Sequence, residues 1–194
     1  MPLVKEISEE EIESIAELHD VRNFYAGTTS IRFFSPNPSG TVLDNNYNSN
    51  PLPGQTPYDL LSLGIELGPN PLVEDSGNNI DPLAILNTFL SGIIELEVDG
   101  GKEQAFVHPI SDYVDTDNID WDHTSNTLSV GSKQLFKIMD PFLVRRNRQF
   151  DLTLRWQDAS ALPSQTDWSN STAQHGSDLK IVTTVQVNDY GDNF

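Results

Sequence analysis

Residues 141–156, PFLVRRNRQFDLTLRW, decide the fold class of this chain. Apolar and polar residues alternate from Phe150 onwards, and an extended segment places successive side chains on opposite faces. The apolar face of this segment comprises Phe150, Leu152, Leu154 and Trp156. The alternation predicts a β-strand whose apolar face forms one wall of a buried core.

The same stretch contains four of the six arginines in the chain, Arg145, Arg146, Arg148 and Arg155. The chain is otherwise acidic, with 29 acidic and 11 basic residues and a formal net charge of -18. Nucleic-acid binding needs a surplus of basic residues to neutralise phosphates, so no sequence-specific nucleic-acid partner is expected. An acidic, lysine-poor surface is typical of proteins that work at high salt, and an ordinary acidic protein is the alternative.

Length and composition indicate a single globular domain. The chain has 194 residues, of which 37% are hydrophobic, and this is enough to bury one continuous core. It has no cysteine, which excludes disulfides and thiolate metal sites. No apolar run approaches the ~20 residues that span a bilayer, and no signal sequence is recognisable at the N-terminus. We therefore expect no membrane span and no export signal.

The N-terminal segment has the pattern of a short helix. Ser8 can cap the helix, and a glutamate three residues later completes a capping box. Ile12 and Ile15 belong to an apolar stripe, and further glutamates occupy the opposite face. We therefore expect residues 1–23 to form a helical arm and residues 24–194 to form a single domain.

The rest of the chain consists mainly of short runs with strand character, separated by residues that favour turns. The runs lie at residues 29–34, 58–67, 93–98, 102–107, 127–130, 134–138, 150–156 and 179–187. The clearest hairpin signal is Asp99-Gly100-Gly101 between two of them. Several of the connections are long, which favours Greek-key over meander connectivity. The sequence predicts an all-β fold, an eight-stranded jelly-roll sandwich or barrel with a short N-terminal helix.

The connections carry further predictions. Asp81 and Pro82 can start one or two helical turns, and residues 112–126 and 157–176 have the composition of polar loops. The first and last strands commonly pair in such a fold, so we expect the runs at residues 29–34 and 179–187 to be neighbours.

Metal-binding chemistry has one weak candidate. The acidic segment contains four aspartates that could offer oxygen ligands to calcium, Asp115, Asp117, Asp120 and Asp122. The spacing departs from that of an EF-hand loop, and a solvated acidic loop is the alternative interpretation. The four histidines are scattered along the chain at His19, His108, His123 and His175, without the spacing of a metal-ligand pair.

Catalytic signatures are weak. Glu95 and Glu97 could act as a carboxylate pair on one strand face, but many acidic strands have this spacing. There is no nucleophile elbow and no glycine-rich phosphate loop. We expect neither an enzyme nor a cofactor. Trp121 and Trp168 lie in polar segments and are expected to be exposed, where they would contact another subunit or, in a carbohydrate-binding or adhesion β-sandwich, a sugar.

A family resemblance follows from the order of several segments rather than from one motif. These are TTSIRFF (28–34), LPGQTPYDLLSLGIELGPN (52–70), FLSGIIELEVDGGKE (89–103), HPISDY (108–113) and residues 141–156. Over roughly residues 24–190 the chain resembles the single jelly-roll major capsid proteins of tailless icosahedral viruses with an internal membrane. Among these, it is similar to the small capsid proteins of halophilic archaeal viruses, which have vertical single β-barrels.

The resemblance implies a capsid subunit located in the virion. Its implied partners are other copies of itself, a second jelly-roll capsid protein and, as a further option, the internal viral membrane. The implied subunit contacts are Arg145, Arg146, Arg148, Trp121, Trp168, Ile12 and Ile15. For the arginines, pairing with the chain's own carboxylates and contact with lipid headgroups are the alternatives.

Overall fold

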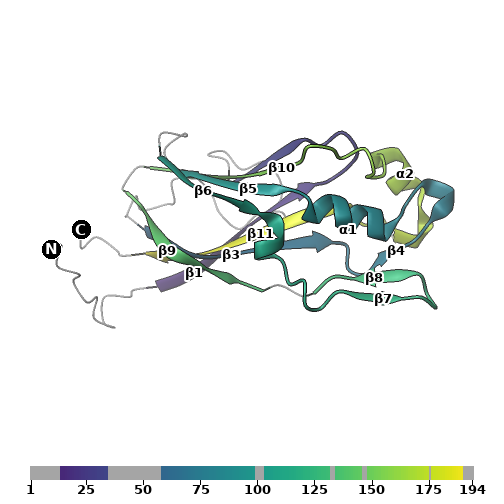
Figure 1. The fold of residues 1–194 in the computed structure, drawn as a ribbon, viewed down its shortest axis with the longest axis horizontal. Helices are drawn as coiled ribbons and strands as arrows, with labels where there is room; N and C mark the ends of the chain where they lie inside the picture. Colours follow the sequence, from purple (N-terminus) through teal and green to yellow (C-terminus); the bar gives the residue numbers. More distant parts are fainter. Residues whose placement is uncertain are drawn as a thin grey trace.

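Two antiparallel sheets form the body of the molecule and face each other across the core (Figure 1). The computed structural model describes residues 14–34, 58–98, 103–131, 134–145, 148–174 and 176–189. Within these residues the fold is predominantly β, as the sequence predicts, and the sheets do not close into a barrel.

The first sheet, called here the β1 sheet, has the order β1-β11-β3-β9, and the β2 sheet has the order β2-β10-β5-β6. The strands of the β1 sheet are β1 (Ser14–Asn23), β11 (Lys180–Asp189), β3 (Tyr58–Gly68) and β9 (Phe136–Val144). Those of the β2 sheet are β2 (Ser30–Phe33), β10 (Phe150–Arg155), β5 (Ile93–Val98) and β6 (Glu103–Pro109).

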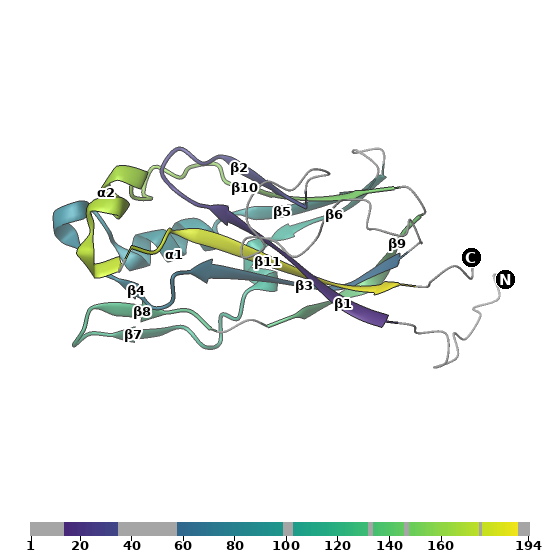
Figure 2. The ribbon, with the colours of Figure 1, turned by 180° about the vertical axis from the view of Figure 1, so that it is seen from behind.

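Smaller elements gather at one end of the two sheets (Figures 1 and 2). A three-stranded sheet comprises β4 (Leu72–Val73), β8 (Thr127–Ser129) and β7 (Asp120–Asp122). The helices are α1 (Pro82–Leu90) and α2 (Gln165–Asn170), with 3-10 turns η2 (Ser76–Asn78), η3 (Ile110–Tyr113) and η4 (Thr172–Gln174). No helix among the described residues is long and apolar enough to cross a membrane.

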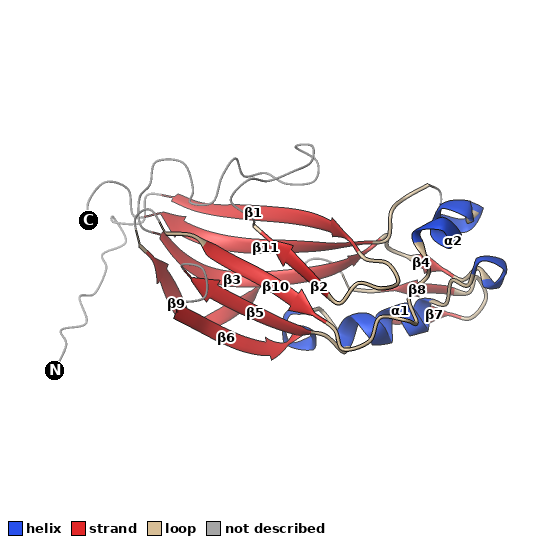
Figure 3. Cartoon of the chain, turned by 90° about the horizontal axis from the view of Figure 1, so that it is seen from above, coloured by secondary structure: helices blue, strands red, loops and turns tan. Residues whose placement is uncertain are grey.

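The strand register defines the two ends of the molecule. Ser14 pairs with Asp189, Asp189 with Tyr58, and Tyr58 with Val144, so β1 begins where β11 and β9 end. We call this the terminal end. The opposite end, with α1, α2 and the three-stranded sheet, is called the helical end (Figure 3). β10 starts at the terminal end and finishes towards the helical end.

The core lies between the two large sheets and is rich in aromatic residues. Leu152 and Leu154 of β10 are fully buried, as the alternation predicts. The Phe150 ring contacts Tyr58 of the opposite sheet, with ring centroids 6.2 Å apart. At the other end of the strand, the Trp156 ring packs on Phe24 with a centroid distance of 4.7 Å. The alternating face of residues 150–156 therefore forms a wall of the core.

The helical arm predicted for residues 1–23 is wrong from Ser14 on, because residues 14–23 form strand β1. Leu18 is buried and Glu17 is exposed, which is the period of a strand. All 10 residues of β1 pair with β11 in one continuous register. Hydrogen bonding to a strand that is distant in sequence outweighs the local helix preference of the glutamates. The predicted helix start at Ser8 lies outside the described residues.

The predicted pairing of the runs at residues 29–34 and 179–187 is also wrong. β11 has β1 as its neighbour, whereas β2 pairs with β10, with Phe33 opposite Leu152. The run at residues 29–34 is the second strand of the fold rather than the first.

The two predicted loops contain regular structure. Residues 112–126 include part of η3 and the strand β7, and residues 157–176 include α2 and η4. The α2 helix begins with a capped turn, in which Ser164 Oγ accepts a hydrogen bond from the Asp167 backbone N–H at 3.1 Å. The helical turns predicted after Asp81 are confirmed, because Asp81 caps α1 by accepting hydrogen bonds from two backbone N–H groups.

Candidate functional site

Two of the predicted interface arginines lie on the surface at the terminal end. Arg145 follows β9 directly, and its carbonyl accepts a hydrogen bond from the Arg148 backbone N–H at 3.0 Å. Both residues are exposed. Within the described residues, the Arg145 guanidinium has no ion-pair partner. Arg146 lies outside the described residues.

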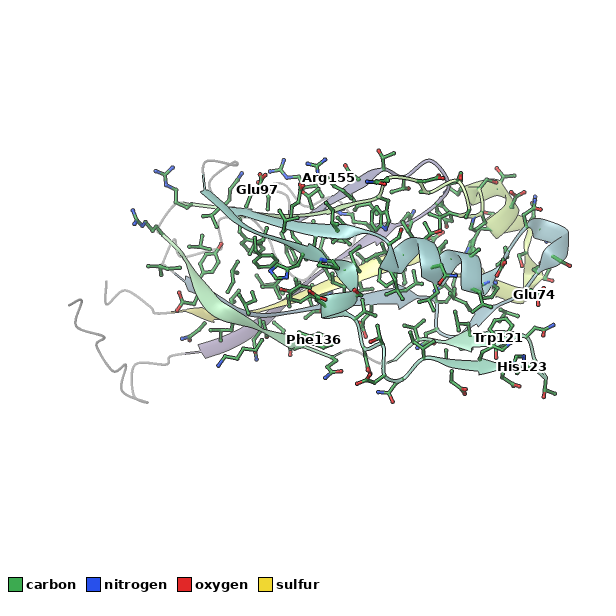
Figure 4. The ribbon with its side chains drawn as sticks, in the orientation of Figure 1. Glu74, Glu97, Trp121, His123, Phe136 and Arg155 are labelled. Carbon is green, nitrogen blue, oxygen red and sulfur yellow. The ribbon has the colours of Figure 1, made fainter. Side chains whose placement is uncertain are left out.

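Arg155 is separated from this pair. It stands at the opposite end of β10 from Phe150, roughly 16 Å away at ~3.3 Å per residue. Its Nε donates a hydrogen bond to Glu95 Oε2 at 2.5 Å, and both side chains are on the outer face of the β2 sheet. Figure 4 shows Arg155 on this outer side, towards the helical end. For Arg155, pairing with the chain's own carboxylates is therefore the correct interpretation.

An exposed leucine accompanies the terminal-end arginines. Leu143 has 52% of its surface exposed, the largest fraction among the exposed large apolar residues of the described chain. It precedes Arg145 by two residues, with the buried Val144 between them, so Leu143 and Arg145 point to the same side. Their strand, β9, is at the edge of the β1 sheet. We call Leu143, Arg145 and Arg148 the terminal-end patch.

Sequence reasoning found the arginines of this patch and missed Leu143. Every residue of the segment 141–144 is apolar in the sequence, so alternation gives no signal that separates an outward leucine from an inward valine. Ile12, another predicted contact, lies outside the described residues. Ile15 falls within β1, but its side chain lies outside the described set.

The predicted exposure of Trp168 is wrong. Only 2% of its surface is exposed, and its Nε1–H donates a hydrogen bond to the Ser177 carbonyl. The ring lies edge-on to Tyr25, with a centroid distance of 6.5 Å. The reason is the α2 helix, whose signal in the sequence is Ser164 followed three residues later by Asp167. The capped turn starts the helix that directs the Trp168 side chain into the core.

Trp121 is intermediate in exposure between a core residue and a surface residue. It is partly buried against the core and lies on β7, at the edge of the three-stranded sheet. Its Nε1–H donates a hydrogen bond to His123 Nδ1 at 2.9 Å, and both residues lie at the helical end (Figure 4). Trp121 and the terminal-end patch are therefore at opposite ends of the molecule.

The four candidate calcium ligands are not brought together. Asp115 is buried and accepts a hydrogen bond from Asn118 Nδ2 at 2.8 Å. Hydrogen bonds from Ser125 and the Thr124 backbone hold the pKa of the Asp122 carboxyl below its usual value. Asp117 and Asp120 are exposed. Among the described residues no cluster of three or more His, Asp or Glu side chains could hold a metal ion.

The carboxylate pair considered for catalysis is part of the charged outer face of the β2 sheet. Glu95 pairs with Arg155, and Glu97 lies opposite Asp151 on β10. Asp151 in turn accepts a hydrogen bond from Arg32 Nε at 2.8 Å. Two ion pairs within the chain, Arg155 with Glu95 and Arg32 with Asp151, therefore lie on this face.

A scan against protein-family models and a search of curated proteins give no match to this chain. The functional argument therefore rests on the strand order and on the surfaces described above. The terminal-end patch offers apolar and cationic surface together, a combination suited to binding an acidic protein partner.

Proposed function

We propose that this chain is a structural subunit of a viral capsid, in which the strands of the two large sheets form a jelly roll. The observation that carries the proposal is the strand order. In a jelly roll one sheet contains the first, last, third and sixth strands, and the other contains the second, seventh, fourth and fifth. Leaving aside the short strands β4, β7 and β8, the two large sheets have this order.

Jelly rolls occur in capsid proteins, lectins and cupins, so the strand order needs a second argument. The terminal-end patch supplies it. An exposed leucine beside an arginine whose guanidinium has no ion-pair partner among the described residues is a suitable contact for another acidic subunit. The glycan-binding alternative loses one of its two proposed platforms, because Trp168 is buried.

The net charge predicts how such a subunit behaves. At a formal charge of -18, copies of the chain repel one another in dilute buffer. The Debye length falls from ~10 Å at 0.1 M salt to ~3 Å at 1 M, so added salt suppresses this repulsion. Burial of Leu143 is not weakened by salt. Self-association of the capsid subunit should therefore increase as the salt concentration rises.

Mass photometry and sedimentation velocity over a range of salt concentrations test the proposal. The expected result is association that grows with salt and decreases in Leu143→Ser and Arg145→Glu. Leu83→Ser is the matched control, because Leu83 is 46% exposed but lies on α1 at the helical end. A wild-type chain that stays monomeric at every salt concentration, or association that Leu83→Ser weakens as much as Leu143→Ser does, overturns the proposal.

A further inference from the structure

We propose that a surface pocket at the helical end of the β2 sheet binds a neutral, hydroxyl-rich ligand of monosaccharide size. The pocket has a volume of about 460 Å³, within the range of small-molecule sites. Three segments that are distant in sequence form it, at the start of β2, at the start of β5 and at the end of β10. Its lining residues are Thr29, Ser30, Ser91, Ile93, Arg155, Trp156 and Gln157.

The strand register explains why these residues meet. Arg155 of β10 lies opposite Ser30 of β2 on one side and opposite Ile93 of β5 on the other. The three side chains therefore stand in a row on the outer face of the sheet. Ile93 is 39% exposed and gives the row an apolar surface, on which the C–H groups of a sugar ring can pack.

The polar groups of the pocket match a ligand that carries hydroxyls. A serine or threonine hydroxyl and a glutamine amide can each donate and accept hydrogen bonds, as sugar hydroxyls do. Thr29, Ser30 and Gln157 are exposed, and their side chains make no hydrogen bond within the described part of the chain. These groups can bind a ligand without first breaking an interaction inside the protein.

The charge balance favours a neutral ligand over an anion. Arg155 is the cation of the pocket, and the hydrogen bond from its Nε to Glu95 places a carboxylate beside the guanidinium. The pair cancels most of the local charge, and the net charge of -18 repels anions from a distance. The same hydrogen bond fixes the guanidinium plane and leaves its terminal amino groups for a ligand oxygen.

Hydrogen bonds within the chain hold the residues at the base of the pocket in place. Trp156 is 5% exposed, its backbone N–H donates to the Thr29 carbonyl at 2.9 Å, and its Nε1–H donates to the Phe89 carbonyl at 3.2 Å. Ser91 Oγ donates to the Thr88 carbonyl at 2.7 Å. Because the base is already ordered, a ligand does not have to immobilise it, and this reduces the entropy cost of binding.

Saturation-transfer NMR and calorimetric titration of the full chain test this site directly. The probes are glucose, galactose, mannose and N-acetylglucosamine, with glucuronate and inorganic phosphate as anionic comparisons. We expect binding of at least one neutral sugar and weaker or no binding of the anions. Ser30→Ala and Gln157→Ala should each weaken that binding by about two- to tenfold, the value of one hydrogen bond.

The substitutions are at exposed positions, so they should leave the thermal midpoint unchanged, which circular dichroism checks. Leu83→Ser, on α1 and outside the pocket lining, should keep wild-type sugar binding. The proposal is overturned if no neutral sugar binds, if only the anions bind, or if Ser30→Ala and Gln157→Ala both bind as the wild type does. The test uses the monomer at low salt, so its outcome is independent of capsid assembly.

Discussion

Replacing Trp168 by alanine should destabilise the fold far more than the same change at Trp121. Trp168 is 2% exposed, and the substitution removes its ring from the contact with Tyr25 together with the hydrogen bond to the Ser177 carbonyl. Truncation of a buried tryptophan costs about 3–5 kcal/mol of unfolding free energy. This is a large fraction of the ~5–15 kcal/mol that stabilises a typical domain. Trp121 is only partly buried, so its truncation should cost about 1 kcal/mol.

Urea unfolding followed by far-ultraviolet circular dichroism measures the difference. At a typical slope of ~1–3 kcal/mol per molar urea, Trp168→Ala should lower the midpoint by roughly 1–5 M, with the slope unchanged. Its thermal midpoint should fall by roughly 6–20 °C. Trp168→Phe keeps most of the buried ring but leaves the Ser177 carbonyl without its donor, so it should cost about 1–2 kcal/mol.

The comparison is made at one fixed salt concentration, because the net charge contributes to stability in every variant. Two results would refute the reasoning. The first is a Trp168→Ala protein within about 0.5 kcal/mol of the wild type. The second is an equal loss in Trp168→Ala and Trp121→Ala, because the two residues would then be similarly exposed.

Three further predictions concern stability. A Cβ atom at Gly92 would lie 2.5 Å from Ile110 Cδ1 and from Trp156 Nε1. Gly92→Ala should therefore lower the free energy of unfolding, measured in urea, by about 1–3 kcal/mol. An unfolding midpoint equal to that of the wild type would contradict this packing. The Tyr58 hydroxyl is buried and has no hydrogen-bond partner within the described part of the chain, so Tyr58→Phe should be neutral or stabilise the protein by about 1 kcal/mol. A loss of stability larger than that would reveal a partner for the hydroxyl. Burial is the largest influence on the Tyr25 hydroxyl and raises its pKa from 10.0 to about 12. The unfolded chain therefore loses this proton at a lower pH than the folded protein does. The stability that Tyr25 contributes is fully present below pH 10 and is lost as the pH rises to about 12. Ultraviolet titration of wild type against Tyr25→Phe checks this, and ionisation of Tyr25 near pH 10 in the folded protein would show that the hydroxyl is not buried.

Strands with one buried face could be predicted from the sequence because their signal is local. The alternation at residues 150–156 gives both the strand and its inward face, and the predicted hairpin partners β5 and β6 are paired. A defect inside a strand is harder to predict. The sequence pattern groups Leu61 with the apolar face of β3, but the register shifts between Leu60 and Ser62. Leu60 is fully buried as a result, and Leu61 is only partly buried.

Pairing between distant segments could not be predicted from local patterns. The residues from Ser14 onwards have glutamates and an apolar stripe that suit a helix, and only the β11 ladder makes them a strand. The pocket proposed at the β2 sheet is a similar case. Ser30, Ser91 and Gln157 are unremarkable in the sequence, and they become neighbours through the register of β2, β10 and β5. The exposure of Arg145 and Arg148 could be predicted from the sequence, because a run of charges in a turn is exposed wherever the turn lies.

The antiparallel order of the strands explains why the two proposed surfaces are compatible. β1 begins and β11 ends at the terminal end, so four connections of the two large sheets lie at the helical end. Two of these connections, from β3 to β5 and from β10 to β11, are bound to each other by polar contacts. Asp75 accepts a hydrogen bond from Ser171 Oγ at 2.6 Å, and the Val73 carbonyl accepts one from Gln174 Nε2 at 2.6 Å. A subunit held in a shell through the terminal-end patch would therefore present its helical end away from that contact. The hydrogen-bonded connections and the pocket beside them would both lie at this exposed end.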